Sequence, residues 1–424
     1  MKPPAISASH RSVWNRIRVQ LGGGILLAAL LPFAIRMSVD PQGEDPTSVN
    51  YSLAGSIVAI IAGYFGFRRM SFYPGVRVAY SILPAFAASF GMVLTFFFLV
   101  RLDYSRLQFI ASFLICIAWY FAVYFRIRRQ RLRVGVLPFG AVETVYQTPE
   151  LECVTISSLD QDLGGLNGIV ADLRADIPDE WERFLADQAL NDVLVMHAKQ
   201  VVESMTGRVD IEHLSENTFG SLIPGIVYGK VKRLIDLAGA IVILPFLALM
   251  LLPVSLLIKL DSPGPIFFRQ ERMGYRGNVF TIIKLRTMRQ SAGEGIDERS
   301  AAMTRDNDDR VTRVGRFLRQ YRIDELPQAI NVLRGQMSWI GPRPEAVPLS
   351  LWYQQELPFY RYRHIVRPGI TGWAQVRQGH VADVDEVLGK LHYDFYYIKN
   401  FSFWLDLLII ARTIRTILSG FGAR

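Results

Sequence analysis

The sequence predicts a membrane protein in three parts. These are a four-helix transmembrane bundle over residues 1–130, a small cytoplasmic α/β domain over 131–225, and a mixed α/β domain over 226–424 with a re-entrant membrane helix at about 235–260. Three observations predict this fold class: four apolar stretches open the chain, a polar region with short apolar runs follows, and a fifth apolar stretch with two prolines precedes a region rich in arginine, glycine and proline. Half of the 424 residues are hydrophobic, yet the net charge is +9. Together these values favour a membrane protein with arginines on its cytoplasmic face, and only secondly a nucleic-acid binder.

The four opening stretches are long enough to be membrane spans, since a bilayer core of about 30 Å takes about 20 helical residues. They run over 21–37, 51–67, 78–100 and 106–125. The first follows a basic segment and could imitate a signal peptide. No small-residue cleavage site is evident, so we expect it to be retained.

Loop charges predict the topology of the bundle. The N-terminus, the second loop and the segment after the fourth stretch are basic, whereas the first loop contains Asp40, Glu44 and Asp45. By the positive-inside rule, both ends of the bundle are expected on the cytoplasmic side. The two cysteines, Cys116 and Cys153, and six scattered histidines fit neither a disulfide framework nor a zinc site.

The middle region alternates strand-like and helix-like segments. "LRVGVLPF", "GIVADL" and "DVLVMHA" are predicted strands, and "PDEWERFLADQAL" is a predicted helix that Pro178 opens. No GxGxxG motif follows the first strand, so the sequence does not support a bound dinucleotide. The role of this domain stays open between a spacer and a dimerisation module.

The fifth apolar segment has basic residues at both ends: Lys232 and Arg233 precede it, and Lys259 lies near its end. A span here would place the two basic flanks on opposite sides of the membrane. Pro245 and Pro253 each remove a helical hydrogen bond and favour a bend. We therefore expect a bent helix that enters and leaves the inner leaflet, with an ordinary kinked span as the alternative.

The segment "RIDELPQ" places two carboxylates, Asp324 and Glu325, beside each other. Pro327 is the predicted start of a helix that ends near Gly335, so the acids would lie just before or within its first turn, where the helix dipole favours negative charge and phosphate. One carboxylate could attack phosphorus while the other helps to hold Mg²⁺. A simple helix cap is the alternative. Arginines around the pair favour phosphate chemistry, namely Arg313, Arg316, Arg319 and Arg322.

From about 230 to 419 the sequence resembles one family, the bacterial polyprenyl-phosphate glycosylphosphotransferases, which are monotopic sugar transferases. The resemblance rests on a series of ordered motifs, namely "KRLIDLAGA", "LIKLDSPGPIFFRQERMG", "IIKLRTM", "DDRVTRVGRFLR", "RIDELPQAINVLRGQMSWIGPRPE", "RPGITGWAQV" and "HYDFYYIKNFSFWLDLLII". It implies a monotopic catalytic domain that transfers a sugar 1-phosphate from a UDP-sugar to undecaprenyl phosphate and releases UMP. Four spans with an α/β domain are typical of the long form of the family.

The resemblance also implies roles for single residues. Asp324 is similar to the nucleophile that forms an aspartyl-phosphosugar intermediate, and Glu325 to the Mg²⁺ ligand. The implied substrate contacts are Lys284, Arg286, Arg319 and Arg343, with Arg367 and Gln375 near the nucleotide or the lipid phosphate. Asp394 and Asp406 stay open between a functional and a structural role.

The family further implies the bacterial inner membrane, a catalytic domain on its cytoplasmic face, and the first membrane step of exopolysaccharide, capsule or O-antigen synthesis. A hexose such as glucose or galactose is the expected sugar, with an N-acetylated or deoxyamino sugar left open, and a homodimer is expected. A CDP-alcohol phosphotransferase lacks support because its DxxDGxxAR motif is missing. A non-catalytic regulator of polysaccharide assembly is the alternative. The stretch "LSLWYQQELPFYRYRHIV" fits either the membrane interface or the core of the domain.

Overall fold

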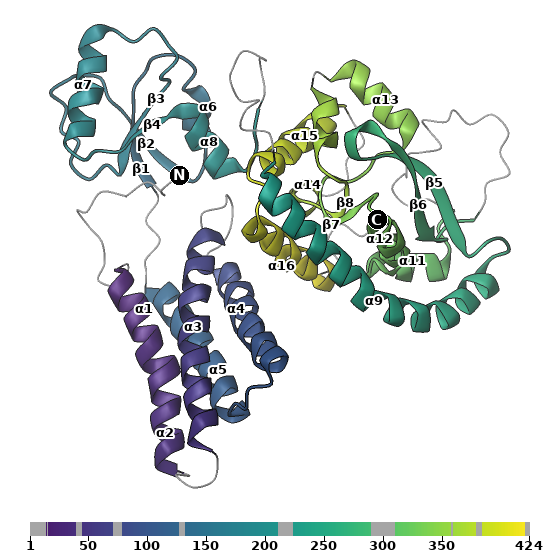
Figure 1. The fold of residues 1–424 in the computed structure, drawn as a ribbon. Coiled ribbons are helices and arrows are strands. Elements are labelled where there is room, and N and C mark those ends of the chain that lie inside the picture. The colour runs from purple at the N-terminus through teal and green to yellow at the C-terminus, as the bar shows by residue number, and fades with distance from the viewer. Residues whose placement is uncertain are drawn as a thin grey trace. The chain divides into compact units, whose positions relative to one another are not determined.

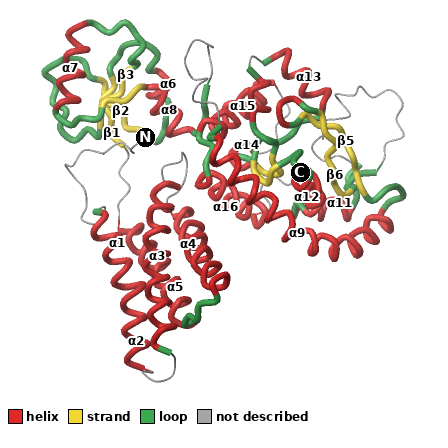
Figure 2. The backbone as a smooth tube through the Cα atoms, viewed as in Figure 1, coloured by secondary structure: helices red, strands yellow, loops and turns green. Residues whose placement is uncertain are grey.

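The computed structural model describes residues 14, 16–39, 45–70, 79–126, 132–210, 224–289, 310–357, 359–378 and 384–419. Two compact units are present, Met1–Gly207 and Arg208–Arg424 (Figures 1 and 2). The second unit begins ahead of the predicted boundary because Val209 N donates to His392 O at 3.0 Å, and Asp210 lies 3.2 Å from the His392 ring.

The first unit opens with long apolar helices at the four predicted stretches. A continuous helix consists of α1 (Ile17–Ile25), a π-helical segment (Leu26–Leu30) and α2 (Leu31–Val39), and it is followed by α3 (Pro46–Met70), α4 (Ala79–Val100) and α5 (Arg106–Arg126). Glycines permit close helix packing: a Cβ at Gly63 would lie 2.4 Å from the Phe86 ring, and one at Gly55 would lie 2.4 Å from the Phe97 ring. Small residues of this kind are typical of helix contacts inside membranes.

A four-stranded parallel sheet follows in the order β2-β1-β3-β4. Its elements are β1 (Leu132–Val136), α6 (Glu143–Tyr146), β2 (Leu151–Thr155), β3 (Gly168–Ala171), α7 (Asp179–Leu190), β4 (Val195–His197) and α8 (Ala198–Thr206). β1, β3, β4 and α7 coincide with the predicted elements. β2 was not predicted, because it is an edge strand in which Leu151 alone is buried and it therefore has almost no apolar pattern.

The second unit is a mixed α/β domain with two small sheets. Its first half contains α9 (Ile226–Asp261), β5 (Phe267–Met273), a 3₁₀ turn η5 (Tyr275–Gly277), β6 (Val279–Leu285), α11 (Arg313–Gln320), a 3₁₀ helix η6 (Ile323–Gln328), α12 (Ala329–Leu333) and β7 (Ser338–Ile340). Its second half contains α13 (Val347–Glu356), η7 (Tyr360–Ile365), β8 (Gly369–Thr371), α14 (Trp373–Arg377), α15 (Val384–Lys399) and α16 (Phe403–Ser419). β5 pairs antiparallel with β6, and β7 pairs parallel with β8.

The N-terminal half of α9 binds this domain through a polar stripe. Lys232 forms a buried ion pair with Asp406 at 2.6 Å. Asp236 accepts hydrogen bonds from Ser338 Oγ at 3.0 Å and from Trp339 N at 3.2 Å. Because Lys232 and Asp236 are four residues apart, they lie on the same face of the helix. The motif "KRLIDLAGA" is therefore the docking face of α9.

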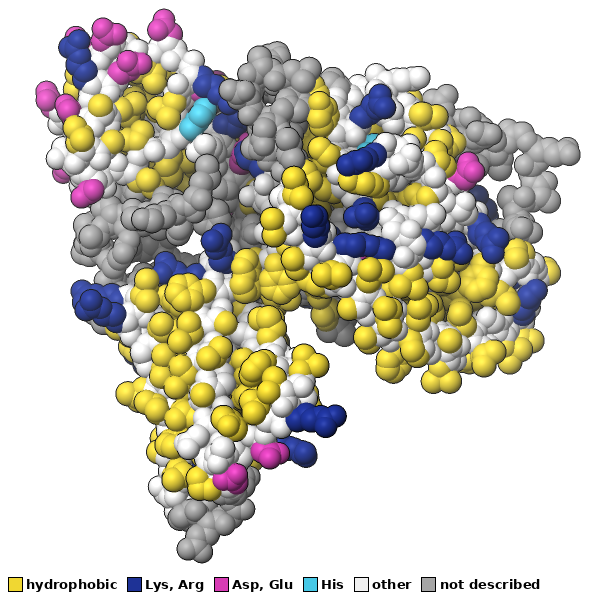
Figure 3. All heavy atoms as spheres, in the orientation of Figure 1, with side chains coloured by type: hydrophobic (Ala, Val, Ile, Leu, Met, Phe, Trp, Pro, Cys, Tyr) yellow, Lys and Arg dark blue, Asp and Glu magenta, His cyan; other side chains and the backbone are white. Residues whose placement is uncertain are grey.

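The other end of α9 binds the same domain. Arg286 donates to the carbonyls of Ile258 at 3.3 Å and Ser262 at 2.6 Å, and the Asp261 carboxylate accepts from Val314 N at 2.9 Å. Between the two ends, outward side chains such as Phe246 and Leu252 are exposed. Figure 3 shows these apolar side chains as a band along α9, bordered by lysines and arginines. The helix runs without interruption through both prolines.

Within the described residues, five helices are long and apolar enough to cross a membrane by length and composition: Ile17–Val39, Pro46–Met70, Ser81–Val100, Arg106–Arg126 and Ile226–Asp261. The chain is therefore a membrane protein.

Candidate active site

The acid pair, Asp324 and Glu325, lies in the first turn of the 3₁₀ helix η6. The predicted helix start at Pro327 was wrong, because the helical turn begins four residues earlier and contains that proline. Arg322, with φ of 55°, turns the chain sharply just before it. The end of the segment agrees with the prediction: α12 stops at Leu333, and Gly335 has φ of 78°.

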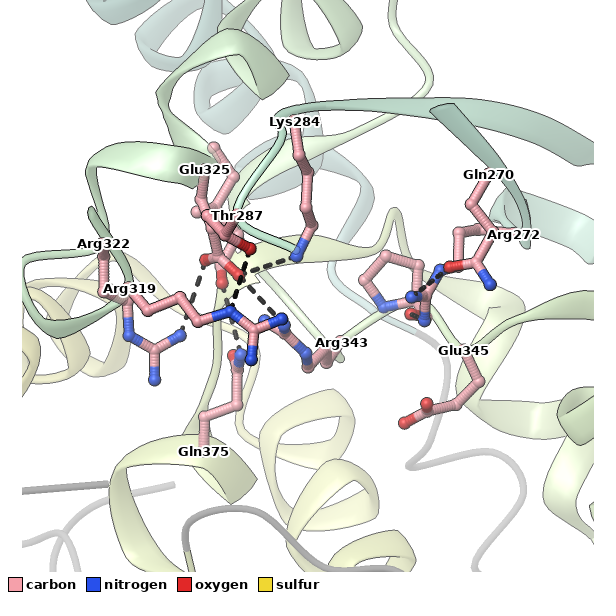
Figure 4. A network of polar contacts seen from close by, with 12 residues as sticks. Gln270, Arg272, Lys284, Thr287, Arg319, Arg322, Glu325, Arg343, Glu345 and Gln375 are labelled. Atoms are coloured by element: carbon pink, nitrogen blue, oxygen red, sulfur yellow. Dashed lines mark hydrogen bonds and ion pairs between the residues drawn. The ribbon is translucent and has the colours of Figure 1, made fainter. Parts of the chain in front are cut away.

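Glu325 is buried and surrounded by cations (Figure 4). Its Oε1 accepts from Lys284 Nζ at 2.9 Å and from Arg343 Nη2 at 2.9 Å, and its Oε2 lies 3.5 Å from Arg322 Nη1. Burial alone would raise the pKa of Glu325, but the charges of Arg343 and Lys284 hold it well below the ordinary value. Glu325 is thus a permanent carboxylate that fixes the positions of three cations.

Asp324 has a different environment although it is the next residue. It is 8% exposed, and its carboxylate accepts no hydrogen bond from any residue that the structure describes. Burial and the charge of Glu325 raise the pKa of Asp324 to about 6. A buried carboxylate of raised pKa with open oxygens is a better nucleophile than one bound by ion pairs. The two neighbouring acids therefore differ in their hydrogen bonding and in the direction of their pKa shifts.

Arg319 reaches the site because α11 packs closely on the end of β6. The Thr312 side chain caps α11 by accepting from Gly315 N at 2.9 Å. A Cβ at Gly315 would lie 2.1 Å from the carbonyl oxygen of Thr287, so only glycine permits this contact. Arg319 Nε then donates to Thr287 Oγ1 at 2.9 Å (Figure 4). The sequence reading missed Thr287, whose only signal was its position just after the Lys284 strand.

Arg343 is held through the backbone of its own segment. Arg363 donates to the Arg343 carbonyl at 2.9 Å, and Arg272 donates to the Pro344 carbonyl at 3.0 Å. Met273 N donates to the Glu345 carbonyl at 3.0 Å. The backbone of the "GPRP" segment is therefore held at several points, and the guanidinium of Arg343 extends from it to Glu325.

A buried charge network lies behind this segment. Arg363 Nη2 is 2.9 Å from Asp394 Oδ2 and its Nη1 is 3.8 Å from Glu345, which also pairs with Lys390. Burial would lower the pKa of Arg363, but Tyr360 and the charges of Asp394 and Glu345 raise it. The network touches the backbone of Arg343 and not the acid pair. These contacts favour a structural role for Asp394.

Asp406 takes part in a second buried cluster. Besides Lys232, it accepts hydrogen bonds from Tyr228 at 2.5 Å and Tyr397 at 2.9 Å. These contacts join α9, α15 and α16 in one buried cluster. In the stretch "LSLWYQQELPFYRYRHIV", Tyr353, Tyr360 and Arg363 pack in the core, whereas Leu351 is 49% exposed, so the stretch keeps both a core side and an exposed side.

The remaining predicted substrate contacts differ in their surroundings. Arg286 is buried, and its guanidinium donates to the carbonyls of Ile258, Ser262 and Pro263 at the end of α9; its contact with substrate stays a prediction. Arg367 donates to the Gly335 carbonyl at 3.0 Å and stacks over Tyr275 at 5.1 Å, near the C-terminal end of α12. Gln375 lies beside the arginines of the acid pair in Figure 4, and its amide oxygen is buried without a partner among the described residues.

The candidate active site consists of the acid pair together with Lys284, Arg319 and Arg343. A buried nucleophilic carboxylate beside guanidinium groups and a lysine suits phosphoryl transfer, and the apolar face of α9 places that chemistry in a membrane-bound enzyme.

Comparison with known proteins identifies the family of this chain. Residues 227–420 match the family model described as bacterial sugar transferase. The chain is 45% identical over 407 residues to the UDP-N-acetylgalactosamine-undecaprenyl-phosphate N-acetylgalactosaminephosphotransferase of Aeromonas hydrophila, covering 95% of this chain and 94% of that protein. It is 44% identical over 202 residues to the UDP-glucose:undecaprenyl-phosphate glucose-1-phosphate transferase of Caulobacter vibrioides, covering 47% of this chain and 74% of that protein. It is also 41% identical over 188 residues to the exopolysaccharide production protein PSS of Rhizobium leguminosarum, covering 43% and 92%. The chain belongs to the bacterial sugar transferases, the polyprenyl-phosphate glycosylphosphotransferase family, and it is an enzyme.

Proposed function

We propose that the protein transfers a sugar 1-phosphate from a UDP-sugar to undecaprenyl phosphate through a covalent intermediate on Asp324. One observation carries the proposal: Asp324 has open carboxylate oxygens, whereas the adjacent Glu325 is bound by three cations. The printed names of the relatives support the two substrates.

The reaction has two displacements at one phosphorus atom. A carboxylate oxygen of Asp324 attacks the phosphorus that bears the sugar, the bond to the bridging oxygen breaks, and UMP leaves with that electron pair. A phosphate oxygen of the acceptor then attacks the same phosphorus. The acyl phosphate bond breaks, which frees Asp324 and gives a sugar linked to the lipid by a diphosphate.

Positive charge around the acid pair matches the diphosphate of the donor. Lys284 and Arg343 are already held in place by Glu325, and Arg319 is held by Thr287. Because the three cations are fixed before the substrate arrives, little reorganisation is needed as charge moves between phosphate oxygens. Burial lowers the pKa of Lys284, but Glu325 opposes that effect.

A magnesium ion fits the donor set at this site. No group of three or more His, Cys, Asp or Glu side chains forms a metal cage within the described residues. Mg²⁺ commonly uses one or two carboxylates, together with substrate phosphates and water. Asp324 and the less engaged Oε2 of Glu325 would hold it, and bound Mg²⁺ would neutralise phosphate oxygens during transfer.

We further propose that α9 does not cross the membrane. Lys232 near its start and Ile258 near its end both bind the same compact domain, so the two ends lie on one side of the bilayer. Four spans then remain, and the acid pair would face the cytoplasm, where UDP-sugars are made. In this arrangement the acceptor phosphate and Asp324 meet at the inner leaflet.

Cysteine labelling tests this topology. In a variant with Cys116 and Cys153 replaced by serine, a cysteine at exposed Glu271 should react with a membrane-impermeant maleimide only after the inner membrane is opened. A cysteine at Asp45, in the first loop, should react in intact spheroplasts. Labelling of position 271 in intact spheroplasts would show that α9 crosses the membrane.

The relative that matches almost the whole chain is the best guide to the donor sugar. The N-acetylgalactosamine phosphotransferase matches the bundle and middle domain as well as the catalytic region, whereas the glucose enzyme matches 47% of the chain. We therefore propose an N-acetylated hexosamine as the donor sugar, in place of the plain hexose expected from the sequence. Its use would start a surface polysaccharide such as exopolysaccharide, capsule or O-antigen.

A panel of UDP-sugars tests the function. Protein in lipid discs with Mg²⁺ and undecaprenyl phosphate is expected to release UMP from UDP-N-acetylgalactosamine at least about tenfold faster than from UDP-glucose. Chelation of Mg²⁺ should suppress release with either donor. Release from UDP-glucose alone would correct the sugar, and no release from any donor by folded protein would favour the non-catalytic scaffold.

A further inference from the structure

Two aromatic side chains at the C-terminal end of α11 are exposed next to each other: Phe317 lies in the helix and Tyr321 is its C-cap residue. Phe317 is 55% and Tyr321 is 44% exposed, and their ring centroids are 5.0 Å apart. Being four residues apart, they share one face of the helix. We call them the aromatic pair. Single exposed aromatics are common, but two exposed aromatic rings in contact favour an apolar partner.

The aromatic pair continues the apolar surface of α9. Leu318, beside Phe317 in sequence, is 2% exposed and packs in a cluster with Ile258 of α9 and Leu285 of β6. Val314 N is bound by Asp261, the last residue of α9. The last turns of α9 expose apolar side chains of their own, namely Leu256, Leu257 and Leu260. α11 therefore lies against the end of the helix that we place in the inner leaflet.

The opposite side of α11 belongs to the active site. Arg319 projects to Thr287 next to the acid pair, and Arg316 is exposed one turn before it. The 3₁₀ helix with Asp324 begins only two residues after Tyr321. One short helix thus presents guanidinium groups on one side and aromatic rings on the other. An anionic amphiphile, with a phosphate head and an apolar tail, complements both sides.

We propose that the aromatic pair binds the first isoprene units of the polyprenyl phosphate acceptor. This inference rests on the proposed function and assigns its acceptor site. The tail must leave Asp324 and enter the bilayer, and the aromatic pair lies on the side of α11 that adjoins the bilayer-facing end of α9. Aromatic rings suit this depth because they are favoured at the membrane interface.

The test compares a double variant, Phe317→Ser with Tyr321→Ser, with wild-type protein in discs of fixed lipid composition. Undecaprenyl phosphate is varied as a mole fraction, and UMP release is measured against both substrates. The kcat/KM for undecaprenyl phosphate should fall about tenfold, as expected from the loss of a few buried methylene contacts. The kcat/KM for the UDP-sugar should stay unchanged, because the donor reacts before the acceptor binds.

Two controls sharpen the comparison. Phe246→Ser removes a 69% exposed aromatic from the middle of α9 and should leave both values unchanged. Phe317→Leu with Tyr321→Leu should restore most of the acceptor kcat/KM, since it restores apolar area. The proposal would be overturned if kcat/KM fell equally for both substrates or for neither. It would also be overturned if the Phe246→Ser variant showed the same fall for the acceptor. Wild-type turnover in the same discs reports separately on the proposed function.

Discussion

Replacement of Asp324 by asparagine is expected to abolish UMP release, with a loss of about a thousandfold or more. The substitution keeps the size of the side chain and removes the oxygen that forms the acyl phosphate. Asp324 accepts no hydrogen bond among the described residues, so the fold loses no hydrogen bond that the structure shows. The loss should therefore appear in kcat, while thermal stability stays within about 1 kcal/mol of wild type.

The matched control is Glu356→Gln, which neutralises an exposed carboxylate on α13 of the same unit. It should leave UMP release unchanged. If Asp324→Asn retained a tenth of wild-type release, direct attack of the acceptor on the donor would replace the covalent intermediate as the account of the reaction.

Replacement of Asp394 by asparagine is expected to destabilise the second unit by about 3 kcal/mol, because it leaves Arg363 buried without its closest charge partner. The side chains of Arg363 and Asp394 are 3% and 2% exposed, so water cannot replace the lost charge. For a unit of this size the apparent melting temperature should fall by about 6–12 °C. The catalytic rate should fall too, since Arg363 holds the carbonyl of Arg343.

An exposed ion pair provides the comparison for this variant. Arg133 and Glu152 are 49% and 55% exposed at 3.1 Å, and Glu152→Gln should change the melting temperature by less than about 2 °C. An Asp394→Asn protein that melts like wild type would show that the network contributes nothing to stability and that Arg343 is held by other contacts.

Much of the fold could be predicted from the sequence because hydropathy determines it. The apolar stretches of the bundle and the strand β3, which is fully buried, have clear patterns. The 3₁₀ helix around Asp324 could not be placed correctly, since Pro327 suits a helix start in general. The 3₁₀ helix begins at Ile323, directly after Arg322. The positive φ of Arg322 that permits this start has no sequence signature.

The candidate site, like the fold, could be predicted from the sequence only in part. Its acids could be predicted because an acid pair among arginines is typical of phosphate chemistry, and the cations Lys284, Arg319 and Arg343 were named from the family resemblance. Arg286 has the same residue type and similar spacing, yet it binds the end of α9. Thr287 and the Arg363 network act through packing between segments far apart in the chain, so no local motif could identify them.

Mass spectrometry can detect the proposed covalent intermediate on Asp324 itself. Protein incubated with Mg²⁺ and its UDP-sugar, without any acceptor, is quenched in acid and digested. The account predicts that the peptide containing Asp324 gains the mass of one sugar phosphate, that added undecaprenyl phosphate removes it, and that Asp324→Asn never acquires it. A modification on another residue, or turnover by a protein that never gains this mass, would contradict the account.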